Sequence, residues 1–436
     1  MQGPIFAFSE QFMLGLLVLG FWSFIGCQGH PPNETPDSAL VRRIGDTTFV
    51  SNSFLGRPDT AEMVEVTRVI RTDGPEDLQL FSWTQLTVGW RGEVYVADPN
   101  GVRMVSPDGG EMRWVARRGQ GPSEIRSVAG MTVDSSGHLL VVDEGNRRIT
   151  VFDTSGVVLD HWPLPPGRTG YGLRALTPVS GGEFLLPFFP AIEGPTWERQ
   201  FPRAIYLRLD DMGAVLDTVF VPLRLHENCP FEDDGAWSQS YLGDTRTAYF
   251  PKVTWMATRE GGVTLGCPTQ FEFESVQPSG QVLRVSLDKS PYPTPSEERD
   301  WFVRSIEESA EVTGRAWKWT GPPPPATRPF YSRILVGRHG RIWIWPELPS
   351  SKEIVRGRET WRPARTGAFD VFDPDGTFVG SVSLPEGAQY RGSTFEGLFD
   401  PFIAWDTVWI FRQDSLDVKY LSKMVIQWPT KADGRP

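Results

Sequence analysis

Three acidic residues stand where short apolar segments end. Asp98 and Asp143 each close a run that begins with a turn glycine, and Glu347 follows a third such run, 340–346. If these runs are equivalent strands of a repeat, the three carboxylates lie on one rim, where they could transfer protons or hold a metal ion. Carboxylates at this position also cap the backbone amides of the next loop, so the sequence leaves both roles open.

Other catalytic chemistry has little support in the residue types. The five histidines are scattered, without the His-x-x-x-His or carboxylate–His spacing of a zinc centre. The run Glu232-Asp233-Asp234 could ligate calcium, although a solvated acidic loop explains the same residues. We therefore predict no cofactor and leave calcium as the one metal that the sequence permits.

A unit that recurs six times determines where these residues lie. In each copy a turn leads into a short apolar strand, and these strands open near 92, 137, 182, 262, 340 and 406. The first two intervals (137 − 92 and 182 − 137) are both 45 residues, the length of a four-stranded propeller blade. The repeat predicts an all-β fold, a six-bladed β-propeller of four-stranded blades over residues 63–430, followed by a tail at 431–436.

The last copy differs from the others at its end. It runs into 418–428 without the Asp-Gly or Ser-Gly turn that separates the third and fourth strands of the first two copies. The early strand 64–71 has no blade of its own. We expect it to complete the sixth blade and so close the ring, which would leave no open sheet edge.

The second copy carries a family resemblance. Its corner Gly119-Gln120-Gly121-Pro122-Ser123-Glu124-Ile125, followed by Met131-Thr132-Val133-Asp134, resembles NHL-type repeats and, more closely, the bacterial six-bladed β-propeller lipoproteins. The match is good over about residues 64–165 and coarse beyond. The resemblance implies a propeller in the bacterial cell envelope, but its motifs specify no ligand and no reaction.

Four insertions lengthen blades three to five, at 187–202, 223–246, 290–328 and 346–365. In a propeller these connections lie on one rim, and loops elaborated on one side of a rigid scaffold usually form a binding surface. The tryptophans in the insertions could stack on sugars or peptides, or could instead pack the loops down. With Glu347 they make up the candidate binding face: Trp197, Trp237, Trp301, Trp317, Trp319 and Trp361.

The third insertion has the one segment of helical character. Thr294-Pro295-Ser296-Glu297 offers an N-cap, a first-turn proline and a capping-box acid, which predicts a helix near 295–311. Trp301, Phe302 and Ile306 would share one side of this helix. It would be either a lid over the binding face or a decoration whose aromatic side chains pack on a neighbouring blade.

The N-terminus and the cysteines predict export. Residues 12–25 are an uncharged apolar run of signal-peptide length, shorter than the about 20 residues that span a bilayer. The run ends at Cys27 in a sequence that resembles a lipoprotein signal, so 1–27 is interpreted as a signal with a lipidation site and 28–62 as a flexible tether. An ordinary secretory signal and a short uncleaved anchor are the alternatives.

We expect Cys229 and Cys267 to form a disulfide, with two buried free thiols as the alternative.

The functional expectation is a binding protein. The sequence predicts an exported, lipid-anchored propeller of the periplasm or outer membrane that binds a protein, peptide or glycan on the insertion-bearing face. A hydrolase or lyase with a metal at the channel mouth is one alternative, and a structural subunit of an envelope complex is another. The net charge of −11, with no basic run longer than a pair, argues against a nucleic-acid partner. No catalytic residue is assigned.

Overall fold

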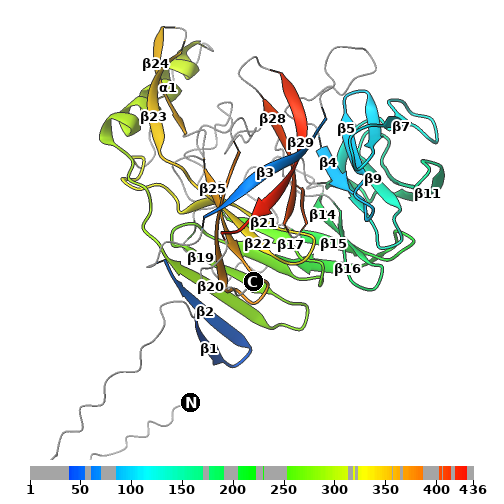
Figure 1. The fold of residues 1–436 in the computed structure, drawn as a ribbon, viewed down its shortest axis with the longest axis horizontal. Coiled ribbons are helices and arrows are strands. Elements are labelled where there is room, and N and C mark those ends of the chain that lie inside the picture. Colours follow the sequence, from blue (N-terminus) through cyan, green and yellow to red (C-terminus); the bar gives the residue numbers. More distant parts are fainter. Residues whose placement is uncertain are drawn as a thin grey trace, which may run out of the picture. The chain divides into compact units, whose positions relative to one another are not determined.

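Strands dominate the structure of this chain. A computed structural model describes residues 39–54, 60–69, 85–169, 176–190, 205–221, 229, 253–312, 318–319, 323–355, 357–363, 367–385, 402–404, 406–413 and 418–429. Within these residues the single helix is α1 (Ser296–Val312), at the place where the sequence predicts one (Figure 1). No helix in this described part has the length and hydropathy that crossing a membrane requires.

The described strands form consecutive antiparallel meanders. The first comprises β4 (Gln85–Val88), β5 (Val94–Asp98), β6 (Gly101–Val105) and β7 (Met112–Arg117). The second comprises β8 (Val128–Val133), β9 (Leu139–Asp143), β10 (Arg148–Phe152) and β11 (Val158–Pro163). In the third, β12 (Gly167–Thr169) and β13 (Thr177–Pro178) both pair with β14 (Phe184–Pro190), and β15 (Ile205–Leu209) and β16 (Val215–Phe220) follow.

The same order continues along the chain. The next meander comprises β17 (Thr254–Ala257), β18 (Val263–Gly266), β19 (Glu272–Val276) and β20 (Val282–Asp288). After it come β21 (Tyr331–Val336), β22 (Ile342–Pro346), β25 (Ala368–Phe372) and β26 (Phe378–Ser383). The last comprises β27 (Phe402–Ala404), β28 (Thr407–Gln413) and β29 (Lys419–Gln427). Each of the six predicted strand openings is therefore followed by a strand.

Turn chemistry and burial explain why these strands form. Gly92 and Gly137 precede β5 and β9 with φ of 88° and 90°, a region that glycine enters without steric cost. Strands β5, β9 and β22 are buried at every residue, as expected of continuous apolar runs between packed layers.

An apolar cluster joins each meander to the next. Each boundary can be represented by one pair of residues from the same cluster: Tyr95 and Val141, Leu140 and Phe184, Leu185 and Val263, Phe273 and Ile342, and Trp343 and Val408. A further cluster contains Trp409 of β28 together with Val94 of β5, so the last meander also packs against the first.

The early strand β3 (Thr60–Val69) lies beside the last strand of the chain. It pairs antiparallel with β29, from Leu421 opposite Val69 to Gln427 opposite Glu62. It also makes a short parallel contact with β26, so the last two meanders belong to one eight-stranded sheet. The pairing with β29 is where the sequence places the early strand.

The predicted tether at 28–62 is wrong for its second half. There β1 (Leu40–Ile44) and β2 (Thr47–Ser53) form a hairpin, and β2 pairs parallel with β20 at the edge of the fourth meander. The turn between the two strands is Gly45-Asp46, a recognised hairpin signal, and Gly45 has a φ of 57°. The Asn52 side chain fixes β2 by donating to the carbonyl oxygens of Ser286 (3.1 Å) and Gly376 (3.0 Å). Residues 28–38 lie outside the described part.

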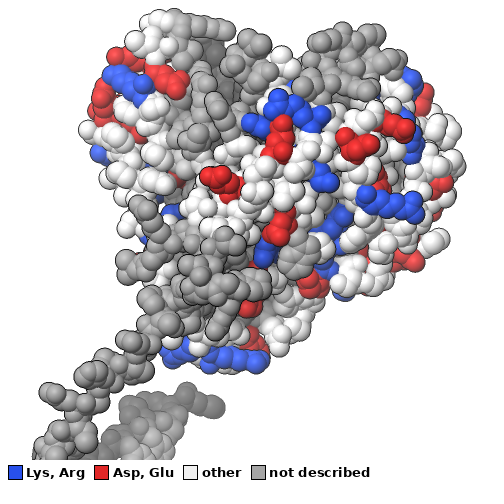
Figure 2. Space-filling view, in the orientation of Figure 1, with Lys and Arg blue, Asp and Glu red and all other residues white. Residues whose placement is uncertain are grey.

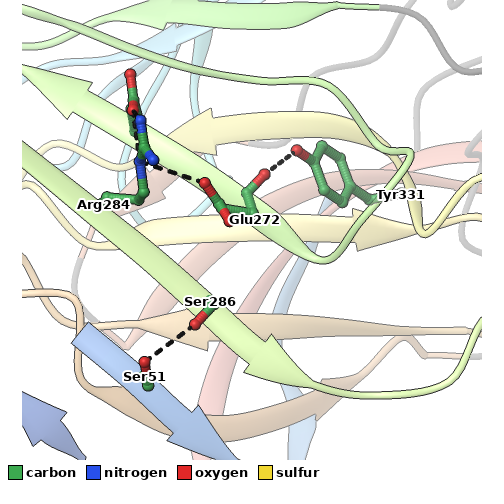
Figure 3. Close-up of polar contacts among 6 residues, drawn as sticks. Ser51, Glu272, Arg284, Ser286 and Tyr331 are labelled. Carbon is green, nitrogen blue, oxygen red and sulfur yellow. Dashed lines mark hydrogen bonds and ion pairs between the residues drawn. The ribbon is translucent and has the colours of Figure 1, made fainter. Parts of the chain in front are cut away.

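Polar contacts join the fourth and fifth meanders (Figure 3). The buried Tyr331 hydroxyl on β21 donates to the carbonyl oxygen of Glu272 on β19. Within the fourth meander, the Arg284 Nε lies 3.3 Å from a Glu272 carboxylate oxygen. Nearby, the Ser286 and Ser51 hydroxyls, 3.4 Å apart, connect β20 to β2.

The predicted disulfide is confirmed: Cys229 and Cys267 are bonded, with Cα atoms 5.9 Å apart.

Candidate functional site: a platform built by two insertions

Two of the predicted insertions meet in the structure. The segment 290–328 supplies α1, and the segment 346–365 supplies a hairpin of β23 (Ser350–Val355) and β24 (Arg358–Pro363). Helix α1 packs on β24, and the three elements lie together at the upper left of Figure 1. We call α1 and this hairpin the insertion platform.

Polar contacts tie the helix to the hairpin. The indole Nε1 of Trp301 donates to the carbonyl oxygen of Glu359 on β24 (3.0 Å). The Lys352 ammonium on β23 bridges the carboxylates of Glu297 on α1 (2.5 Å) and Glu359 (3.0 Å). Trp361 is paired with Lys352 across the hairpin and is half-buried. The platform therefore holds Trp301 and Trp361 on elements that are fastened to each other.

The other side of the helix packs inward. Phe302 and Ile306 are buried, and Trp319 meets the Phe302 ring edge-on at 5.8 Å. The Glu307 carboxylate accepts from the Trp319 backbone amide and from Lys318, both at 2.9 Å, which lowers the pKa of this carboxyl. These aromatic and aliphatic side chains form a small apolar cluster whose members all belong to this insertion, so the cluster does not show the packing on a neighbouring blade that the sequence offered as one interpretation.

The predicted capping box does not form. Backbone bonding of the helix starts with the Arg299 amide donating to the Pro295 carbonyl oxygen, and among the described residues the buried Thr294 hydroxyl has no hydrogen-bond partner. The Thr294 amide donates to the Ala326 carbonyl oxygen, next to the bridge in which Pro293 pairs with Thr327 at the two ends of the insertion. Glu297 turns to Lys352 instead of capping the helix.

A buried charge cluster lies beneath the platform. The guanidinium of Arg328 is fully buried and binds the carboxylate of Glu298 on α1. It also donates to the Ser350 hydroxyl on β23 (2.6 Å) and lies 3.8 Å from the Glu347 carboxylate, just after β22. One arginine therefore connects both insertions to the fifth meander. We call Glu298, Arg328, Glu347 and Ser350 the platform anchor.

Glu347 is under the platform and not on its surface. Only 5% of this residue is exposed. Burial raises the pKa of its carboxyl to about 7, against the opposing effects of Arg328 and of a hydrogen bond with Ser332. This carboxyl is therefore close to half-protonated at neutral pH, although it lies where a ligand on the surface would not reach it.

The other two predicted rim acids cap loops. Asp98 is buried, accepts from the Asn100 amide (2.8 Å) and lies 3.6 Å from the Arg103 guanidinium. Asp143, also buried, accepts from the Ser127 amide (3.0 Å) and from the Asn146 side-chain amide (2.6 Å). No contact among the described residues brings Asp98, Asp143 and Glu347 together.

Metal ligands, surface charge and the remaining predicted residues complete the description of the site. In the described ranges no group of three His, Cys, Asp or Glu side chains could hold a metal ion. On the face seen in Figure 2, basic and acidic side chains are interspersed. The predicted residues that lie outside the described part are Cys27, Trp197, Glu232, Asp233, Asp234, Trp237 and Trp317.

Comparison with known proteins gives fold resemblances only. No protein-family model matches the sequence, and no curated protein matches it. Similar solved structures include a member of the DUF4221 family from Bacteroides vulgatus, with 11% identity over 86% of this chain and 100% of that one and a TM-score of 0.47. A candidate exported protein from Bacteroides fragilis has 9% identity, coverages of 87% and 99% and a TM-score of 0.46. A streptogramin B lyase has 14% identity, coverages of 85% and 93% and a TM-score of 0.37. At these values no activity is transferred to this chain.

Proposed function

We propose that this protein is an exported, lipid-anchored β-propeller that binds a protein, peptide or glycan on its insertion platform. The ring would have six four-stranded blades over residues 63–430, closed where β3 lies beside β29. The cyclic order of the apolar clusters supports this ring, because the last meander packs against the first. The disulfide supports an oxidising compartment, and Cys27 would carry the lipid.

The observation that carries the binding proposal is the way the platform holds its tryptophans. Trp301 and Trp361 are only partly buried, and each lies on an element that Lys352, Glu297 and Glu359 fasten to its neighbour. A rigid indole loses little conformational freedom on binding, and tryptophan is enriched among residues that dominate interface affinity. The platform anchor holds the helix and the hairpin in place from below, and the two tryptophans are not part of it.

A binding screen tests this proposal. The mature protein is incubated with arrays of bacterial envelope oligosaccharides and of extended peptides, in parallel with the Trp361→Ala variant. We expect binding to one array and a loss of about tenfold or more in affinity for the variant, as for a central aromatic contact. Phe220→Ala, which removes an exposed aromatic side chain from β16, is the matched control and should bind normally. Equal binding by Trp361→Ala and wild type would refute the platform as the site.

A separate experiment tests the anchor. The full-length precursor and its Cys27→Ala variant are produced in a bacterium and fractionated after labelling with a fatty-acid analogue. We expect fatty-acid label on the wild type and none on the variant, whose uncleaved apolar segment 12–25 can still hold it at the membrane. An unlabelled wild-type protein that leaves the membrane fraction would rule out lipidation and leave the binding proposal untouched.

A further inference from the structure

Several turns that are distant in sequence meet at a second place in the molecule. They are the turns that connect the first two strands of a meander, and Arg338 lies in one of them, between β21 and β22. Its backbone amide donates to the carbonyl oxygen of Ile403 (2.9 Å). Its guanidinium donates to the carbonyl oxygens of Gly89 (3.2 Å) and Val88, at the end of β4. Arg338 thus joins the first, fifth and last meanders.

Trp90, in the turn after β4, has two cations near its ring. The Arg338 guanidinium carbon is 4.3 Å from the centre of the Trp90 ring, and that of Arg259 is 5.1 Å from it. Arg338 also lies 4.7 Å from the ring centre of Phe402. Trp90 remains 44% exposed, so part of its side chain is open to solvent. We call Trp90, Arg259, Arg338 and Phe402 the turn cluster.

The positive charge of the turn cluster has no direct counterion. Among the described residues, neither guanidinium forms an ion pair with a carboxylate, and Arg259 donates no hydrogen bond through its side chain. The buried Arg338 Nε also has no hydrogen-bond partner in the described part. The acidic groups that influence the two arginines are Glu93 and the exposed Glu260, and the Glu93 carboxylate accepts from the Arg91 amide. The neighbouring His339 supplies no negative charge.

The electrostatics agree with an unfilled site. Burial and the charge of Arg259 lower the pKa of Arg338 to about 10, and burial lowers the pKa of Arg259. A partly buried cation without a carboxylate is unfavourable, and a second one beside it adds repulsion. Two guanidiniums around an exposed indole are also the groups that bind an oxyanion attached to an apolar or aromatic body.

We propose that Arg259 and Arg338 form a binding site for an organic oxyanion, a carboxylate or phosphate, whose apolar part lies on Trp90. The guanidiniums donate to the oxyanion, and the exposed part of the Trp90 side chain contacts the attached group. This site is independent of the insertion platform and of the ligand proposed for it.

The test measures the binding of small probes to the whole protein. Benzoate and phenyl phosphate present the same ring with the two oxyanions, and inorganic phosphate presents the charge alone. Binding is followed by calorimetry and by tryptophan fluorescence on the mature protein. We expect saturable binding of at least one ring-bearing probe in the millimolar range or tighter, and weaker binding of inorganic phosphate. The ring-bearing probe that binds more tightly identifies the oxyanion.

Variants decide whether the cluster is the site. Arg259→Gln should weaken binding at least tenfold, and it should leave the fold intact because the Arg259 side chain donates no hydrogen bond to any residue that the structure describes. Trp90→Leu should reduce binding of the ring-bearing probes more than that of inorganic phosphate. Arg42→Gln, which removes the same charge from the exposed strand β1, should bind like the wild type. Saturation of no probe by the wild type, or equal binding by Arg259→Gln, would overturn the proposal.

Discussion

Two arginine environments in this molecule differ in what surrounds them. Arg328 of the platform anchor is wholly buried and lies between two buried carboxylates, Glu298 and Glu347. Arg338 of the turn cluster is partly buried, donates to backbone carbonyls and shares contact with the Trp90 ring with a second arginine, Arg259. Carboxylates beside the first arginine balance its charge, whereas among the described residues no carboxylate forms an ion pair with the second.

The difference separates a structural role from a binding role. A buried charge is tolerated when partners within the fold compensate for it, and removing one partner then costs stability. A cationic site that lacks an acidic partner contributes less to stability and is free to bind an anion. We therefore expect substitutions in the platform anchor to change stability and substitutions in the turn cluster to change binding.

The largest effect should follow from Arg328→Met. The methionine keeps the length of the side chain but leaves the Glu298 carboxylate buried without its cation, which costs about 3–5 kcal/mol in comparable cases. We expect this loss in the free energy of unfolding measured with urea. Arg304→Met, on the exposed face of α1, is the control and should change stability by less than about 0.5 kcal/mol.

A second variant shows whether the carboxylate is the cause. Combining Glu298→Gln with Arg328→Met removes the uncompensated charge, so part of the lost stability should return. If Arg328→Met were as stable as the wild type, the anchor would not hold the platform.

The next effect is a pH dependence that Glu347 causes. Its pKa of about 7 in the folded state lies above the usual 4.5, so the folded protein retains the proton more tightly than the unfolded chain. The contribution of Glu347 to the free energy of unfolding is complete below about pH 4.5. It declines as the pH rises and is lost above about pH 7, a difference of about 3 kcal/mol. Glu347→Gln removes this dependence. The free energy of unfolding of Glu347→Gln, measured with urea, should therefore rise relative to that of the wild type between pH 4.5 and pH 7.5.

The exposed Glu308 provides the comparison for this titration. Glu308→Gln carries the same substitution on the surface of α1 and should follow the wild-type pH profile. Parallel profiles for Glu347→Gln and wild type would show that Glu347 does not titrate near neutral pH in the fold.

Local signals in the sequence predicted much of the fold. The turn glycines and the apolar runs after them located β5, β9 and β22, because a buried strand needs a continuous apolar run between turns. The helix was located by its proline and its apolar spacing. The pairing of Cys229 with Cys267 follows from their being the two remaining cysteines of a chain that the sequence predicts to be exported.

Contacts between distant segments could not be predicted in this way. Glu297 matched the capping-box pattern, but Lys352, 55 positions away, is its partner, and the adjacent Glu298 is the buried acid. Arg328 had no local signal, since its partners come from α1, β22 and β23. The hairpin of β1 and β2 had the signal Gly45-Asp46, which the tether interpretation passed over.

A smaller effect should follow from Trp301→Phe. The phenyl ring retains the apolar contacts but removes the indole N–H that donates to Glu359. We expect a loss of about 1 kcal/mol in unfolding free energy, the usual net value of one hydrogen bond. Hydrogen exchange should locate the increased opening in α1 and the β23–β24 hairpin. Exchange that stays unchanged there would show that the contact does not fasten the platform.

The smallest change in stability should come from Arg259→Gln. The variant loses a cation–π contact with Trp90, worth about 0.5–1 kcal/mol, but it also removes the repulsion of Arg338. Because the two effects oppose each other, we expect a net change within about 0.5 kcal/mol. Added salt screens the repulsion in the wild type, so its melting temperature should rise more between low and physiological ionic strength than that of the variant. A loss as large as that of Arg328→Met would instead mean that Arg259 is a structural residue, and the contrast between the two arginine environments would then be wrong.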